Sequence, residues 1–153
     1  MKLLSNFVKS IAALFVFVGA ATSAANADSS TSLVGVQGYD LVSYQSGKPV
    51  RGAGTNTFEV DGVVYQFATK ENLKKFKANP AKYLPAYGGY CAFGVSKGKK
   101  FIGDPNVWKV VDGTLYLNLN TDVQRIWEED VPGNITEANG QWKTIANVPA
   151  AQL

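Results

Sequence analysis

The chain has 153 residues, a formal net charge of +3, one cysteine, one methionine and no histidine. This length suits one domain with a hydrophobic core, and the charge lacks the basic excess of a nucleic-acid-binding protein. Without histidine the chain cannot form a hydrolytic triad that uses an imidazole base. One cysteine excludes an intramolecular disulfide and leaves too few soft donors for a zinc or copper site within one chain.

The first 27 residues are typical of a cleaved export signal. Lys2 and Lys9 supply a basic segment, residues 11–21 are apolar, and Ala25-Asn26-Ala27 matches an A-x-A cleavage pattern. The apolar run of 11 residues is shorter than the roughly 20 residues that cross a bilayer. We therefore expect an exported protein, periplasmic or secreted, with no membrane span. Cleavage would lower the net charge to +1 and remove the methionine.

The rest of the chain is predicted to form one domain over residues 38–146, between a flexible tail at 28–37 and a C-terminal tail at 147–153. Near its start, Asp40 is interpreted as a helix cap or loop anchor, or as a carboxylate facing a pocket. The strand-like segments 57–60 and 63–67 flank Asp61-Gly62, which is the signature of a type I′ hairpin.

A helix capped by Thr69 is expected to follow this hairpin and to stop at Asn79-Pro80. The next stretch, residues 87–94, reads Y-G-G-Y-C-A-F-G. With helical spacing, Tyr87, Tyr90 and Cys91 share one apolar face. The sequence thus predicts a central glycine- and aromatic-rich helix with the cysteine on its apolar stripe.

A second hairpin is predicted over residues 108–111 and 114–117, around Asp112-Gly113. A helix capped by Asn120 or Thr121 is expected to run to about residue 130 and to end at Pro132-Gly133. A weaker last helix is expected at 134–145, interrupted at Gly140. Its docking residues are expected to be Ile135, Trp142 and Ile145.

The two hairpin–helix units match at an offset of 51 residues. The matching pairs are Asp61 with Asp112, Gly62 with Gly113, Tyr65 with Tyr116, and Phe76 with Trp127. This pattern fits an internal repeat, and it also fits the shared needs of two unrelated ββα units. In either case we expect an α+β fold, with two ββα units around the central helix.

The motifs along the chain resemble the YHS domain family. Residues 65–83 are similar to that family's aromatic strand, helix and F-x-x-N-P-x-x-Y ending. Exported stand-alone bacterial members are similar in more motifs: G-Y-D at 38–40, Y-G-G-Y-C-A at 87–92, D-P-x-x-W at 104–108, V-D-G-x-L-Y-L-N at 111–118 and W-E-x-D at 127–130.

This resemblance implies a YHS-like domain, but the exported subgroup has no settled activity. Short YHS domains in metal-handling proteins carry a C-P-x-C-G element and further cysteines, and are associated with heavy metals such as copper. The present chain has Ala68 and Asn72 where those cysteines are expected and has no C-P-x-C element.

Four interpretations of Cys91 follow from the sequence. The thiol can be a small buried hydrophobic group, or it can face a cleft. It can join the thiol of a second chain to hold Cu(I) across a homodimer. It can also carry thiol redox chemistry from the first turns of a helix.

We expect a non-enzymatic binding or accessory protein for a small ligand or an envelope protein, with no resident cofactor. The same aromatic and polar side chains either fill the core or line a ligand pocket. The candidate pocket residues are Asp40, Tyr44, Tyr87, Tyr90, Cys91, Trp108, Tyr116 and Asn118.

Overall fold

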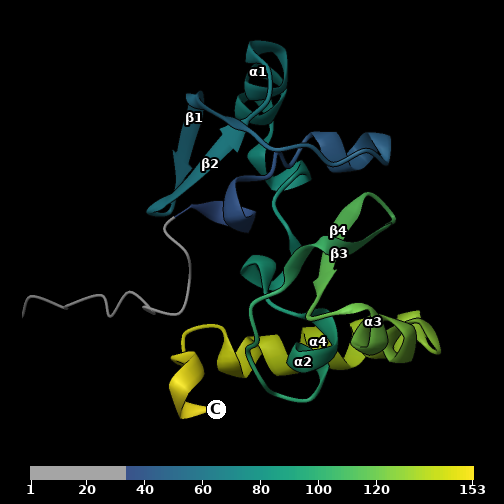
Figure 1. Cartoon of the computed structure of the whole chain (residues 1–153). Coiled ribbons are helices and arrows are strands. Elements are labelled where there is room, and N and C mark those ends of the chain that lie inside the picture. Colours follow the sequence, from purple (N-terminus) through teal and green to yellow (C-terminus); the bar gives the residue numbers. More distant parts are fainter. Residues whose placement is uncertain (1–33) are drawn as a thin grey trace, which may run out of the picture.

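The computed structural model describes residues 34–153, and the predicted export signal and residues 28–33 lie outside the described part. The predicted α+β fold is confirmed: two separate antiparallel hairpins are combined with helices (Figure 1). The strands and helices are β1 (Ala53–Val60), β2 (Val63–Phe67), α1 (Lys70–Ala78), α2 (Ala92–Ser96), β3 (Asp104–Val111), β4 (Thr114–Asn118), α3 (Thr121–Glu128) and α4 (Val131–Ile145). Short 3-10 turns are η1 (Gly35–Gly38), η2 (Ser43–Ser46), η3 (Pro80–Lys82), η4 (Ala86–Gly89) and η5 (Ala150–Gln152).

Both predicted hairpins and both predicted helix caps are confirmed. Asp61 and Gly62 have φ values of 51° and 79°, and Asp112 and Gly113 have values of 49° and 79°. Two consecutive left-handed residues are what a type I′ turn requires, and aspartate followed by glycine tolerates them. The side chains of Thr69 and Asn120 each accept a hydrogen bond from the backbone N–H three residues later, at the start of α1 and of α3.

The backbone shows that the offset of 51 residues is an internal repeat. Ala53 pairs with Phe67, and Asp104 pairs with Asn118, each followed by a register shift at the same place in its hairpin. Backbone hydrogen bonds ahead of the hairpins repeat with the same offset: Gly52 N donates to Gly38 O at 2.8 Å, and Gly103 N donates to Gly89 O at 3.1 Å. The first repeat therefore covers residues 35–78 and the second repeat covers residues 86–128.

The predicted central helix over residues 87–94 is wrong for its first half, and only the second half is helical, in α2. Tyr87, Gly88 and Gly89 have positive φ values of 55°, 63° and 88°, which no right-handed helix contains. The chain forms the turn η4, becomes extended at Tyr90, and only then enters α2 with Cys91 at its N-cap. The glycines favour the left-handed turn, and the apolar residues Tyr87, Tyr90 and Val95 still pack into one cluster without a continuous helix.

The repeats pack head to tail. The segment after η1 places Leu41 and Tyr44 of the first repeat in one cluster with Leu115 and Leu117 from the outer face of the second hairpin. The ring of Tyr44 meets that of Trp108 edge-on at 5.3 Å. This shared core replaces the central helix as the element that joins the two hairpin units.

Helix α4 covers the corresponding face of the second repeat. Ala92 and Val95, at the positions equivalent to Leu41 and Tyr44, form a cluster with Ala138 and Ile145 of α4. In Figure 1 the first repeat lies at the top, the second repeat below it, and α4 at the bottom beside α2. α4 thus takes the place that a third hairpin would occupy in the stack.

The boundary between the last two helices differs from the prediction. Pro132 and Gly133 do not end a helix; they lie in the first turn of α4, where proline loses no hydrogen bond. Asp130 caps this helix, with its carboxylate accepting a hydrogen bond from Gly133 N at 3.0 Å. α4 then continues through Gly140 without interruption.

The two predicted tails also differ in part from the structure. Gly35–Gln37 belong to η1 and therefore to the first repeat. At the other end, η5 follows α4, and Leu153 packs against the cluster around α2 and α4.

Candidate functional site

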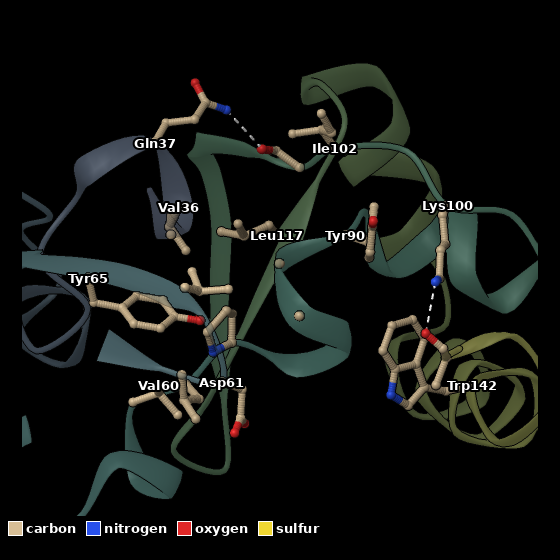
Figure 2. Close-up of a pocket in the computed structure, with 18 residues that line it drawn as sticks. Val36, Gln37, Val60, Asp61, Tyr65, Tyr90, Lys100, Ile102, Leu117 and Trp142 are labelled. Carbon is tan, nitrogen blue, oxygen red and sulfur yellow. Dashed lines mark hydrogen bonds between the residues drawn. The ribbon is translucent and has the colours of Figure 1, made fainter. Parts of the chain in front are cut away.

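A cleft of about 400 Å³ lies where the two repeats meet. Its lining residues come from η1, the first hairpin, the connector before η4, η4 itself, the segment before β3, β4 and α4, as Figure 2 shows. They are Gly35, Val36, Gln37, Val60, Asp61, Val63, Tyr65, Leu84, Pro85, Gly88, Gly89, Tyr90, Lys100, Ile102, Gly103, Leu117, Trp142 and Ala146. The cleft thus depends on the repeat contact and on α4 together.

One wall of the cleft is strained backbone. Val36 and Gln37 have φ values of 48° and 51°, and a β-branched residue in the left-handed region is a true outlier. The second repeat has Tyr87 and Gly88 at these positions, also with positive φ. Strained backbone of this kind concentrates at functional sites, so its position in the cleft wall supports a role for the cleft.

Gly103, which also lines the cleft, lets the segment before β3 pass close to β4 and to η4. A Cβ atom at this position would lie 2.5 Å from Leu117 Cβ and 2.8 Å from Gly89 O. The amide of Gln37 donates a hydrogen bond to Gly103 O at 3.3 Å across the junction (Figure 2). Only glycine allows the segment before β3 to pass this close to β4 and η4 within the second repeat, at the edge of the cleft.

Tyr65 points its hydroxyl into the cleft (Figure 2). The side chain is 7% exposed, and its hydroxyl makes no hydrogen bond to any residue between 34 and 153. Burial, together with the negative charge of Asp61, raises the pKa of Tyr65 above its usual value. The hydroxyl therefore stays protonated at neutral pH and can donate or accept one hydrogen bond inside the cleft.

Aromatic rings and a cation form the wall on the side of α4. The Lys100 ammonium lies 5.2 Å from the centre of the Tyr90 ring and 5.3 Å from that of Trp142. It also donates to the carbonyl oxygens of Ala146 and Val148, at 2.9 and 2.7 Å. These contacts hold the lysine flat against the two rings and fix the shape of this wall.

The corresponding place in the second repeat is filled. The ring of Tyr87 lies 5.9 Å from that of Tyr116 and 5.7 Å from that of Trp142. Its hydroxyl donates to Asn139 Oδ1 at 3.0 Å. Burial, followed by the charge of Tyr116, raises the pKa of Tyr87 to about 12.

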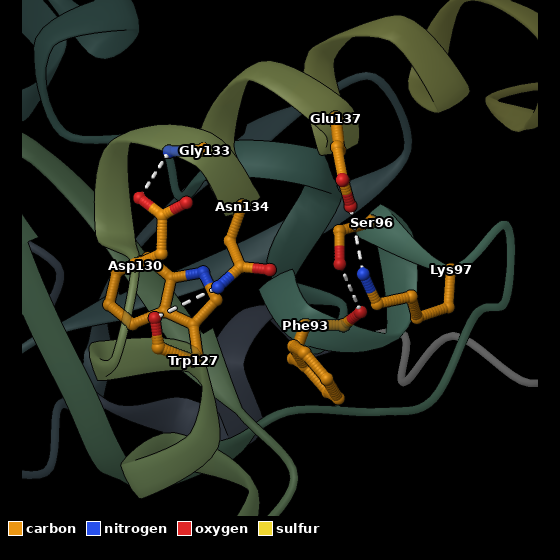
Figure 3. Close-up of polar contacts among 8 residues, drawn as sticks. All are labelled: Phe93, Ser96, Lys97, Trp127, Asp130, Gly133, Asn134 and Glu137. Carbon is orange, nitrogen blue, oxygen red and sulfur yellow. Dashed lines mark hydrogen bonds and ion pairs between the residues drawn. The ribbon is translucent and has the colours of Figure 1, made fainter.

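Polar contacts hold α4 over this filled place, as Figure 3 shows. The Asn134 amide donates to Trp127 O at 3.0 Å, joining α4 to the end of α3. Lys97 and Glu137 form an ion pair of 2.8 Å between α2 and α4. Both partners are about half exposed, so the ion pair orients the helices more than it stabilises them.

The structure distributes the sequence-predicted pocket residues over several places. Tyr90 lines the cleft. Tyr44 and Trp108 form the contact between the repeats, and the Tyr44 hydroxyl donates to Pro105 O at 2.7 Å. Tyr87 and Tyr116 pack together in the cluster that α4 covers.

Asp40 anchors the loop of the first repeat, as one of its two interpretations predicted. The side chain is fully buried. Its carboxylate accepts hydrogen bonds from Val42 N at 2.9 Å, Ala68 N at 2.8 Å and Asn72 Nδ2 at 2.8 Å. These donors tie the start of the repeat to the end of β2 and to α1.

Cys91 occupies the position equivalent to Asp40 in the second repeat. It is 1% exposed, its thiol donates to Asn118 Oδ1 at 3.6 Å, and its sulfur accepts from Gly94 N at 3.4 Å. The Nδ2 atom of Asn118 and the Nε1 atom of Trp127 are buried without a partner among the described residues. This thiol therefore lies inside the second repeat and does not line the cleft.

Sequence reasoning missed most of the cleft residues. Gly35, Val36, Gln37 and Gly103 carry no chemical motif that marks them, and Trp142 is expected from the sequence only as a docking residue. One usable signal is the Gly-Tyr pair, which recurs at 38–39 and 89–90 with the repeat offset. This pair extends the repeat to η1 and η4, and so to the wall of the cleft.

No three His, Cys, Asp or Glu side chains within residues 34–153 gather in an arrangement that could hold a metal ion. No helix in the same range is both long and apolar enough to cross a membrane. Comparison with protein-family models, curated proteins and solved structures gives no match to this chain.

Proposed function

We propose that this chain is an exported member of the YHS domain family that binds a small ligand in the cleft between its two repeats and catalyses no reaction. The observation that carries the proposal is the cleft itself. Its volume of about 400 Å³ falls within the roughly 300–1,000 Å³ of small-molecule sites. Such sites combine apolar walls with a few polar groups, and here Tyr65, Asp61 and Lys100 supply those groups.

The composition of the cleft favours binding over catalysis. Among its lining residues the ionisable side chains are Asp61, Lys100 and two tyrosines. A nucleophile needs an adjacent base within hydrogen-bond reach. The lysine is instead fixed to two backbone carbonyls, and burial keeps Tyr65 in its neutral form.

The two thiol functions, copper capture across a dimer and redox chemistry, remain proposals of lower rank. Both require Cys91 to be reachable from outside the molecule. In the structure the thiol is 1% exposed and bonded within the second repeat. For this reason we locate the function at the cleft.

A fragment screen by ligand-observed NMR, using the purified protein and a chemically diverse set, tests the proposal. Binding fragments are then mapped through the amide shifts of the protein. We expect the shifts to concentrate on Gln37, Gly88 and Gly103 in the cleft. Gly47 serves as the reference, because it does not line the cleft. Fragments that bind only elsewhere, or no saturable binding at all, would contradict the proposal.

A further inference from the structure

The internal repeat allows the cleft beside Val36 to be compared with the equivalent place in the second repeat. Tyr87 of the second repeat is equivalent to Val36, and Tyr116 is equivalent to Tyr65, since each pair differs by 51 positions. The phenol ring of Tyr87 packs between Tyr116 and Trp142 at 5.9 and 5.7 Å. The second repeat thus fills its own site with a ring that carries a hydroxyl.

The first repeat keeps the tyrosine against which that ring packs but lacks the ring. Tyr65 rests on Phe76 at 5.6 Å, as Tyr116 rests on Trp127 at 5.7 Å. Val36 takes the place of Tyr87, and the cleft lies beside it. The Tyr65 hydroxyl faces this space without a hydrogen bond to the described residues.

The far wall is aromatic as well. Tyr90 and Trp142 line the cleft across from Tyr65 (Figure 2). Aromatic side chains on both sides favour a flat ring, because offset and edge-to-face ring pairs are more stable than contact with an aliphatic group of equal area. A volume of about 400 Å³ leaves room for such a ring, since an apolar cavity of roughly 150 Å³ already admits benzene.

We propose that the cleft binds a planar aromatic molecule bearing a hydroxyl or a similar small hydrogen-bonding group, whose ring takes the place in the first repeat that Tyr87 takes in the second. This inference rests on the proposed function and adds the chemical class of the ligand. The ring packs against Tyr65 on one side and faces Tyr90 and Trp142 on the other. Its polar group pairs with the Tyr65 hydroxyl.

The probe for this inference is p-cresol, which is the side chain of tyrosine as a free molecule. Its saturated analogue, 4-methylcyclohexanol, has a similar size and a hydroxyl but no flat ring. In a titration followed by NMR we expect p-cresol to bind with a Kd on the order of 1 mM, as a small fragment does. The analogue should bind at least tenfold more weakly. Nuclear Overhauser contacts from p-cresol to the methyl groups of Val36 are expected.

Variants matched across the repeats complete the test. Val36→Tyr reproduces the residue of the second repeat and should reduce p-cresol binding at least tenfold, whereas Val36→Ala removes methyl contacts but fills no space and should reduce binding far less. Tyr65→Phe should weaken binding about fivefold, which is the effect of one neutral hydrogen bond. Tyr116→Phe, at the equivalent covered position, should leave it unchanged. Circular dichroism confirms that each variant is folded.

Several results would overturn the inference. These are equal binding of the saturated analogue, unchanged binding in a folded Val36→Tyr variant, or contacts from p-cresol that avoid Val36. If Val36→Tyr does not fold, the contacts in the unmodified protein and the Tyr65→Phe and Tyr116→Phe pair decide the question. Non-aromatic fragments that bind at Gln37 and Gly103 while p-cresol does not bind would refute the ligand class and leave the proposed binding function standing.

Discussion

Replacing Asp40 with asparagine should destabilise the protein by about 3 kcal/mol. The buried carboxylate accepts three hydrogen bonds at 2.8–2.9 Å. In the better orientation, the amide of asparagine keeps its oxygen toward Ala68 and Asn72 and turns its NH₂ group against Val42 N–H. One charge-assisted bond is then lost, at about 2 kcal/mol, and two become neutral, at about 1 kcal/mol each. Relief from burying a charge offsets roughly 1 kcal/mol of this sum.

Equilibrium unfolding in urea, followed by far-UV circular dichroism, measures this change in the free energy of unfolding. Asp104→Asn is the matched control, because Asp104 accepts local hydrogen bonds from Asn106 N and Nδ2 but is only partly buried. We expect the control to change stability by less than about 0.5 kcal/mol, as surface substitutions usually do. An Asp40→Asn variant within that same margin would show that the three hydrogen bonds do not hold the loop as described.

Three further predictions address the close glycines, the thiol and the covered tyrosine. Gly52→Ala and Gly103→Ala should each cost about 2 kcal/mol or more in urea unfolding, since the new methyl carbon would lie 2.4 Å from Gln66 C or 2.5 Å from Leu117 Cβ. Gly54→Ala, with nothing within 4 Å, should be nearly neutral. Cys91 should resist alkylation by iodoacetamide until the protein unfolds, because its side chain is 1% exposed. Mass spectrometry measures the alkylated fraction along a urea series, and rapid labelling of the folded protein would favour the thiol functions. The pKa of Tyr87 is raised from 10 to about 12, so between these pH values the folded state keeps a proton that the unfolded state loses. The free energy of unfolding should therefore fall as pH rises from 10 to about 12, and it should fall less steeply in Tyr87→Phe.

The local elements could be predicted because a few residues determine each of them. Asp-Gly at 61–62 and 112–113 sets the hairpin turns, and Thr69 and Asn120 cap the helices with their own side chains. The central helix is different, because the period of its apolar residues and its two adjacent glycines indicate opposite conformations. In Tyr87–Gly89 the backbone follows the glycines.

The candidate site could not be predicted in the same way. Its walls come from segments far apart in the sequence, and Gly35, Gly88 and Gly89 line it with backbone alone. The eight predicted pocket residues stand out by their chemistry, and that chemistry is used mostly to satisfy buried groups, as for Asp40. The full repeat, rather than any single motif, is the sequence feature that carries spatial information.

The way in which the repeats join has a consequence for assembly. Their contact is heterologous, with a different surface on each side, so its geometry alone sets no limit on the number of copies that could be added. The chemistry of the ends sets the limit. On β1 the outward positions equivalent to Trp108 and Val110 are the exposed polar residues Thr57 and Glu59, and α4 closes the opposite end. A chain with apolar residues at those two positions and without α4 would offer complementary docking surfaces at both ends and so become liable to grow into fibres.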